Sequence, residues 1–193
     1  WMLEGDAVVA ETELSNAGRG RSAAFMEYYR ASFLEGEPRS WSQWKLGSYK
    51  HYTPNYYTLG YLTNSTIRYE SGNYGYAGEV FKSLVKNFYT PFARDVSYVP
   101  LVGDVPRRFF RKGREMMTQY WKDELPQRGK ITAAEQLIAD RGNDYREYLS
   151  PVVVGRDSVL YLRYSYNGPS ALVMVSGGKE NVLRRFAANV RKR

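Results

Sequence analysis

The sequence predicts an α+β fold in which a mainly helical domain precedes a small antiparallel β meander. Up to about residue 145, apolar residues recur at helical spacing. After Pro151 the pattern changes to short runs of β-forming residues, separated by glycine and asparagine turns. The chain has 193 residues, of which 43% are hydrophobic and 25% are charged. That length and composition suit one globular core, or one domain with a small appendage.

Helical signals come first along the chain. Ala7, Val8 and Ala10 predict a helix that ends near Leu14, and apolar residues at helical spacing predict a second one over 25–34. Further helices are expected over 40–44, 53–72, 77–88 and 106–121.

Proline and capping residues predict where helices begin. Thr53-Pro54 places a proline in the first helical turn, so the helix that ends at Gly72-Asn73 is expected to start there. The run Thr132-Ala133-Ala134-Glu135 has a capping-box pattern and predicts a last helix. The Pro- and Val-containing stretch between Asp95 and Asp104 is predicted to be a connection.

The β region is predicted to be a meander of short strands joined by tight turns. Strands are expected over 152–154, 158–166, 171–175 and 181–186, with turns at 155–157, 167–169 and 176–178. A meander of about 40 residues is marginal alone and has to pack on something. Its size is that of a single propeller blade.

Charge and composition exclude several classes of function. The net charge is +8, and the basic residues form two clusters: Arg107, Arg108, Arg111, Lys112 and Arg114; and Arg184, Arg185, Arg191, Lys192 and Arg193. The first cluster alternates with Phe109 and Phe110, which is typical of a solvated helix face, so nucleic acid is not expected as a partner. There are no cysteines, which excludes thiol nucleophiles and Cys-based zinc fingers. No apolar run approaches the roughly 20 residues of a membrane span.

The most informative pattern opens the chain. Trp1, Glu4, Gly5, Ala7 and Glu11 follow the spacing W-x-x-E-G-x-A-x-x-x-E. This pattern resembles a segment of the gluzincin metallopeptidases, the superfamily of thermolysin and aminopeptidase N. The resemblance implies that Glu4 is the third zinc ligand, because two histidines one turn apart need a carboxylate to complete the site. It also implies that Glu11, two turns further along the same face, supports the site from behind Glu4.

A second match follows at Tyr57-Thr58-Leu59-Gly60, which resembles the Y-x-x-G of aminopeptidase N-like enzymes. The resemblance implies that Tyr57 donates a hydrogen bond to the developing oxyanion, with Tyr56 and Tyr61 as reserve candidates. The segment 47–60 resembles bacterial gluzincin-like proteins with a Tol-type β-propeller behind the peptidase domain. The implied organisation is a gluzincin-like, mainly helical C-terminal part over 1–148 and a blade-like meander over 149–193. An extracytoplasmic or cell-envelope location is favoured by this resemblance alone.

The departure from the family is equally informative. The chain has no H-E-x-x-H, and His51 is its only histidine, for which a structural or surface role is expected. The chain by itself is therefore expected to bind no zinc tightly and to be inactive. Because it begins at Trp1 in what resembles a helix interior, we expect an upstream segment of the same protein to carry the missing motif.

Two functions follow as hypotheses. In the intact parent, zinc would serve hydrolysis of a peptide or protein substrate; the alternative is a non-catalytic scaffold that binds a protein or peptide partner. The sequence just before Trp1 would discriminate between them. A geometric expectation tests the resemblance: the functional oxygens of Glu4 and Tyr57 should lie within roughly 10 Å of each other in a shared cleft, with Glu11 on the same side.

Overall fold

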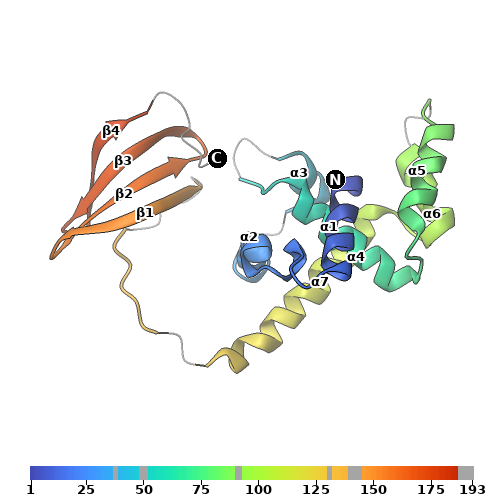
Figure 1. Cartoon of the computed structure of the whole chain (residues 1–193), viewed down its shortest axis with the longest axis horizontal. Helices are drawn as coiled ribbons and strands as arrows, with labels where there is room; N and C mark the ends of the chain where they lie inside the picture. The colour runs from blue at the N-terminus through green and yellow to red at the C-terminus, as the bar shows by residue number, and fades with distance from the viewer. Residues whose placement is uncertain (37–38, 48–51, 90–92, 130–131, 139–144, 187–193) are drawn as a thin grey trace. The chain divides into compact units, whose positions relative to one another are not determined.

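The computed structural model describes residues 1–36, 39–47, 52–89, 93–129, 132–138 and 145–186. It confirms an α+β fold in which helices precede a four-stranded antiparallel sheet (Figure 1). The chain forms two compact units: a helical one made of Trp1–Leu46 and Thr53–Lys130, and a second made of Gly47–Tyr52 and Ile131–Arg193, which contains the sheet. That these units are peptidase-like and blade-like stays a prediction.

In the described residues, seven α-helices and two 3-10 helices form the helical unit. They are α1 (Met2–Leu14), η1 (Arg19–Arg21), α2 (Ala23–Leu34), α3 (Trp41–Leu46), α4 (Tyr56–Ser71), α5 (Tyr76–Lys86), α6 (Ala93–Val102), α7 (Pro106–Glu124) and η2 (Leu125–Arg128). The helices expected before residue 90, and the one expected from Pro106, are present, although α4 starts later than expected. Across the described ranges, no helix combines the length and apolar character that crossing a bilayer requires.

Helix α4 is the central helix of this unit, because most of its circumference is buried. It is rich in threonine, and two buried hydroxyls are satisfied within the helix: Thr63 and Thr66 each donate to the carbonyl four residues earlier, at 2.7 Å. Asn64, fully buried, donates to the Met2 carbonyl at 2.8 Å and accepts from the Tyr76 hydroxyl at 2.6 Å. Thr63, Thr66 and Asn64 therefore lie in the core with their side chains hydrogen-bonded.

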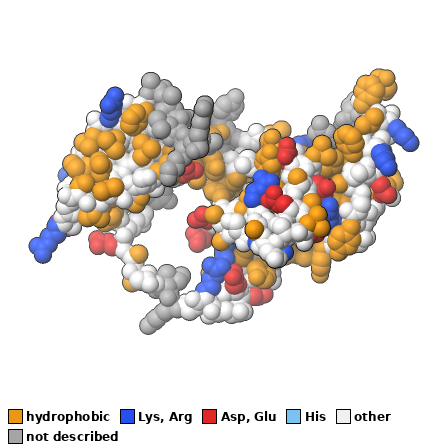
Figure 2. Space-filling view, viewed as in Figure 1, with side chains coloured by type: hydrophobic (Ala, Val, Ile, Leu, Met, Phe, Trp, Pro, Cys, Tyr) orange, Lys and Arg blue, Asp and Glu red, His pale blue; other side chains and the backbone are white. Residues whose placement is uncertain are grey.

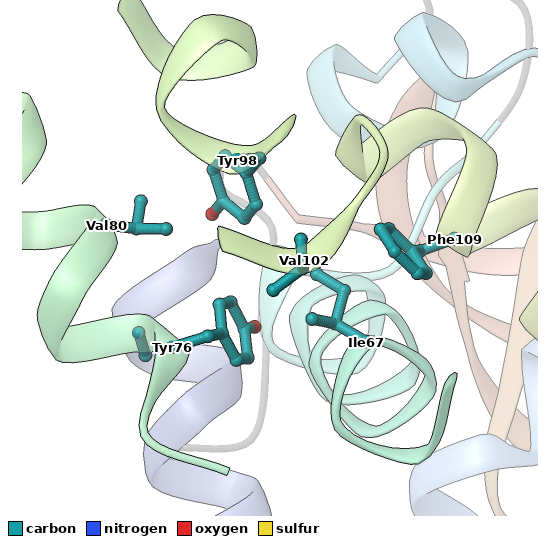
Figure 3. Packing of buried hydrophobic residues seen from close by; sticks show 7 residues of the cluster. Ile67, Tyr76, Val80, Tyr98, Val102 and Phe109 are labelled. Carbon is teal, nitrogen blue, oxygen red and sulfur yellow. The ribbon is translucent and has the colours of Figure 1, made fainter. Parts of the chain in front are cut away.

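Two aromatic-rich clusters cover α4. The first joins α4, α5, α6 and α7, and Figure 3 shows its side chains pointing toward one another: Ile67, Tyr76, Val80, Tyr98, Val102 and Phe109. The second joins α2, α3, α4 and α7 and consists of Tyr29, Trp44, Leu59, Leu62, Phe110 and Trp121. Phe109 and Phe110 enter different clusters, so α7 is held from two sides while its arginines face outward.

The second unit is a meander with the strand order β1-β2-β3-β4: β1 (Arg146–Gly155), β2 (Ser158–Ser165), β3 (Gly168–Ser176) and β4 (Lys179–Arg185). Tyr161, Ala171, Val173 and Val175 form its buried side, and Ile138 packs against them. Large apolar side chains stay exposed on the edge strands: Val152, Val153, Val154, Val182 and Leu183. Figure 2 shows hydrophobic side chains gathered over the visible face of the sheet.

A buried carboxylate ties the strands of this sheet together. The Glu180 side chain is only 4% exposed and pairs with Arg163 at 3.2 Å and Arg146 at 3.5 Å. It also accepts a 2.6 Å hydrogen bond from the Tyr161 hydroxyl. A buried charge needs such partners, because desolvation without them costs several kcal/mol.

Three helical expectations were wrong in detail. Residues 132–138 are not helical, so the predicted capping box at Thr132–Glu135 does not start a helix; these residues are largely exposed, and a short helix without a buried face is not stable. The expected connection between Asp95 and Asp104 contains helix α6, with Pro100 inside it. Helix α4 starts at Tyr56, because Asn55 caps it by accepting from the Tyr57 amide at 3.1 Å.

The strand expectations also need correction. β1 begins at Arg146, six residues before the expected start. Its pairing with β2 shifts register between Leu149 and Val152. Ser150 has φ of 52° there, the left-handed conformation of a bulge. The turn between β2 and β3 is Tyr166-Asn167, so Gly168 and Pro169 lie in β3 and not in the turn. The expected turn at Gly177-Gly178 is confirmed.

Candidate functional site

Helices α1 and α4 cross at two glycines. A Cβ atom on Gly60 would lie 2.8 Å from the Gly5 Cα and even closer to the Trp1 carbonyl oxygen. A Cβ atom on Gly5 would in turn lie 2.6 Å from the Tyr61 amide nitrogen. These backbones can approach so closely only because neither residue has a side chain. The crossing therefore explains why a glycine follows Glu4 and why one stands three residues after Tyr57.

The crossing places Glu4 beside Tyr57. The Glu4 carboxylate, as a hydrogen-bond partner, raises the pKa of the Tyr57 phenol above its usual range. A tyrosine hydroxyl is protonated at neutral pH even without such a shift, so the phenol can donate a hydrogen bond to this carboxylate. The two side chains are therefore close enough to interact, but the cleft that Glu4 lines is lined by Tyr56 and not by Tyr57, so a cleft shared by Glu4 and Tyr57 stays a prediction. Their catalytic roles stay predictions.

Arg19 completes the group on the same side of α1. Its guanidinium carbon lies 5.1 Å from the centre of the Tyr57 ring. Glu11 holds Arg19 by three hydrogen bonds, from the backbone amide at 2.9 Å, from Nε at 2.7 Å and from Nη2 at 3.1 Å. These bonds lower the pKa of the Glu11 carboxyl. Arg19 therefore links Glu11 to Tyr57 and Glu4.

Arg19 was not predicted as a site residue. It lies in η1, between Gly18 and Gly20, and each glycine allows a close approach: Gly18 to the backbone at Thr12, and Gly20 to the Tyr61 ring. The Gly-Arg-Gly run was the only sequence signal for this arrangement. Because arginine between two glycines is common in exposed loops of every kind, tertiary contacts were needed to identify this residue.

Glu4 also lines a cleft of about 450 Å³. Trp1, Trp41 and Tyr98 form its aromatic lining, with the Trp1 ring 5.4 Å from Trp41 and 6.4 Å from Tyr98. Tyr56 lines this cleft together with Glu4. The Tyr57 ring stacks on the Tyr56 ring, with ring centres 5.3 Å apart. Of the reserve candidates, Tyr56 therefore faces the cleft. Tyr61 packs instead against Phe25 and Gly20.

The opposite face of α1 is fixed to α4 by charge. Arg68 has a side chain only 10% exposed and donates to Asp6 at 2.7 Å and to Glu13 at 3.2 Å. Acidic residues thus occupy both faces of α1, and each face has its own arginine partner. Because this pairing and the Asn64 bond to Met2 hold α1 in register on α4, the position of Glu4 is determined by the core.

The residues available for zinc are few. Within the described ranges, no three His, Asp or Glu side chains gather in a way that could hold a metal ion. His51 lies outside the described residues. Glu4 alone would supply one of the three protein ligands that a catalytic zinc needs, so these residues do not fit zinc without help from elsewhere. Comparisons with models of protein families, with curated proteins and with solved structures find no match to this chain.

Proposed function

We propose that the helical unit forms part of a gluzincin-type peptidase site in a longer parent protein. Glu4 would be one zinc ligand, and two histidines and a general-base glutamate would come from an upstream segment. Tyr57 would donate a hydrogen bond to the oxyanion of a peptide substrate. Glu11 would hold Arg19 against the Tyr57 ring. Among the described residues, Glu4 is the one proposed ligand, so the metal site would be completed by residues of the upstream segment.

The proposal is supported by the glycine crossing of α1 and α4, at which the Glu4 carboxylate is a hydrogen-bond partner of the Tyr57 phenol. These residues are far apart in sequence, and a ligand and an oxyanion donor have to serve one reacting group. A close glycine crossing holds them together on helices that are fixed by the core. Preorganised donors of this kind supply a large share of catalysis, since they need no rearrangement during the reaction.

The experiment uses the intact parent protein. Zinc content and cleavage of a fluorogenic peptide are measured for the wild type, Glu4→Gln and Tyr57→Phe. We expect Glu4→Gln to lose zinc, and Tyr57→Phe to keep zinc while kcat falls about 100-fold. Matched controls are Glu27→Gln on α2 and Tyr69→Phe on α4, two exposed side chains outside the site. A parent in which Glu4→Gln binds zinc as tightly as the wild type contradicts the proposal.

A second candidate is a non-catalytic scaffold that binds a protein or peptide segment. It is favoured by the apolar character of the cleft, where Leu3, Tyr56 and Phe81 are 57%, 47% and 48% exposed. Exposed apolar side chains around one cleft are typical of a binding surface. A parent that neither binds zinc nor cleaves peptides, and that loses a peptide ligand on Phe81→Ser, would establish this function in place of the first.

A further inference from the structure

A strongly basic groove lies between α3 and the first half of α7. Its volume is about 720 Å³. Six basic side chains line it: Arg39, Lys45, Arg107, Arg108, Arg111 and Arg114. Among the described residues that line this groove, none is acidic. The groove therefore concentrates positive charge, and such a surface attracts anions.

The fold presents these side chains on a rigid frame. Arg107, Arg111 and Arg114 follow the i, i+4, i+7 spacing of a single helix face, and span roughly 10 Å along α7. Phe110, only 3% exposed, anchors that helix in the core, and the Trp41 ring from α3 lies 5.3 Å from it. The spacing between the arginines is thus set by the helix and not by a mobile loop.

The ion pairs of α7 are unevenly distributed around the helix. Arg108 pairs with Asp104 at 3.3 Å, and Lys112 pairs with Glu70 at 2.6 Å. By contrast, Arg107, Arg111 and Arg114 make no ion pair with any residue that the structure describes. The face turned toward Lys45 of α3 therefore keeps its charge uncompensated. Closely spaced cations repel one another, and an anion bound among them relieves that repulsion.

A further guanidinium is held in place at the edge of the groove. Arg39 lies over the Trp44 ring, 5.1 Å from its centre, and donates to the Tyr28 hydroxyl at 3.0 Å. Stacking and this hydrogen bond restrict the long side chain before any ligand arrives. A side chain already ordered loses less entropy on binding, which favours affinity.

We propose that this groove binds a small ligand that carries two or more clustered phosphate groups. Guanidinium groups present planar, paired donors that match phosphate oxygens, and the groove has five arginines to one lysine. Each phosphate brings up to two charges and three acceptor oxygens, so neighbouring phosphates can engage arginines one helical turn apart. A carboxylate brings only one charge. The proposal does not depend on the function proposed for Glu4 and Tyr57.

Isothermal titration of the 193-residue chain with tripolyphosphate tests this proposal. We expect binding with one site per chain, weakened about 100-fold in the double variant Arg107→Ala/Arg111→Ala, or about tenfold for each lost charge-assisted contact. The matched control is Arg184→Ala/Arg185→Ala, which removes the same charge from exposed positions on β4. That control should bind like the wild type. Circular dichroism spectra check that each variant is folded.

The source of the phosphates is decided by a second arm, since free polyphosphates and lipid headgroups share this chemistry. Cosedimentation with phosphatidylcholine vesicles that contain phosphatidylinositol bisphosphate, sensitive to the same two arginines, would assign the groove to a lipid headgroup; its failure would assign it to a free ligand. The proposal is overturned if tripolyphosphate does not bind or if the control variant loses binding equally. It is also overturned if a polyglutamate peptide or a single-stranded oligonucleotide binds more tightly than tripolyphosphate at equal ionic strength.

Discussion

Replacing Gly60 with alanine tests the helix crossing on which the candidate site depends. The added Cβ would lie 2.8 Å from the Gly5 Cα, and closer still to the Trp1 carbonyl oxygen, whereas real Cβ contacts essentially never fall below 3.0 Å. Both obstacles are backbone atoms of α1 and its N-cap, so no side-chain rotation relieves them. Helix α1 has to move away from α4 to accept the methyl group.

The magnitude follows from two opposing effects. Overpacking of a tight core contact costs about 3 kcal/mol at the upper end of its usual range, which suits a backbone obstacle. Alanine in place of glycine favours the helix by about 1 kcal/mol. We therefore expect Gly60→Ala to lower the free energy of unfolding by about 2 kcal/mol. Gly78→Ala is the matched control, since Gly78 is exposed on α5 and its Cβ would meet nothing within 4 Å.

Urea unfolding followed by far-ultraviolet circular dichroism measures the difference. Because the helices dominate this signal, it reports mainly on the helical unit, even if the sheet unfolds separately. Gly78→Ala should raise the free energy of unfolding by about 1 kcal/mol, so the two variants should differ by about 3 kcal/mol. If Gly60→Ala is as stable as the wild type or more stable, the crossing is looser than described and the account of Glu4 and Tyr57 is wrong.

Three further measurements test other parts of the structure. Arg68→Met should lower the free energy of unfolding by about 2 kcal/mol in the same urea assay, because it leaves two carboxylates on α1 without their buried partner; an unchanged midpoint would show that these pairs contribute nothing. Burial raises the pKa of Tyr29 and of Tyr76 far above the unfolded value of 10.0. The free energy of unfolding should therefore be at its full value below pH 10 and fall above it, by about 1.4 kcal/mol per pH unit for each tyrosine. Tyr76→Phe should make that fall shallower. Elemental analysis of the purified chain should find far less than one zinc per molecule, since Glu4 is the single predicted ligand; stoichiometric zinc would contradict this.

The sequence predicted the elements whose pattern is local. Helices such as α2 and α7 carry apolar residues at a regular spacing, and glycine turns such as Gly177-Gly178 separate the strands. The failures arose where distant contacts overrode local signals. Helix α6 forms despite Pro100 because Tyr98 and Val102 are buried against α4 and α5. The capping box at Thr132 has no such partner and forms no helix.

The candidate site divides in the same way. From the sequence alone, Glu4 and Tyr57 were placed on helices, each with a glycine within the next three residues. Such spacing is a local property of the chain. Only the tertiary structure decided that the two glycines meet and that Glu4 becomes a partner of Tyr57. The roles of Arg19 and of the basic groove likewise became visible only in the fold. Whether an arginine forms an ion pair depends on which carboxylates the packed helices place within about 4 Å of it.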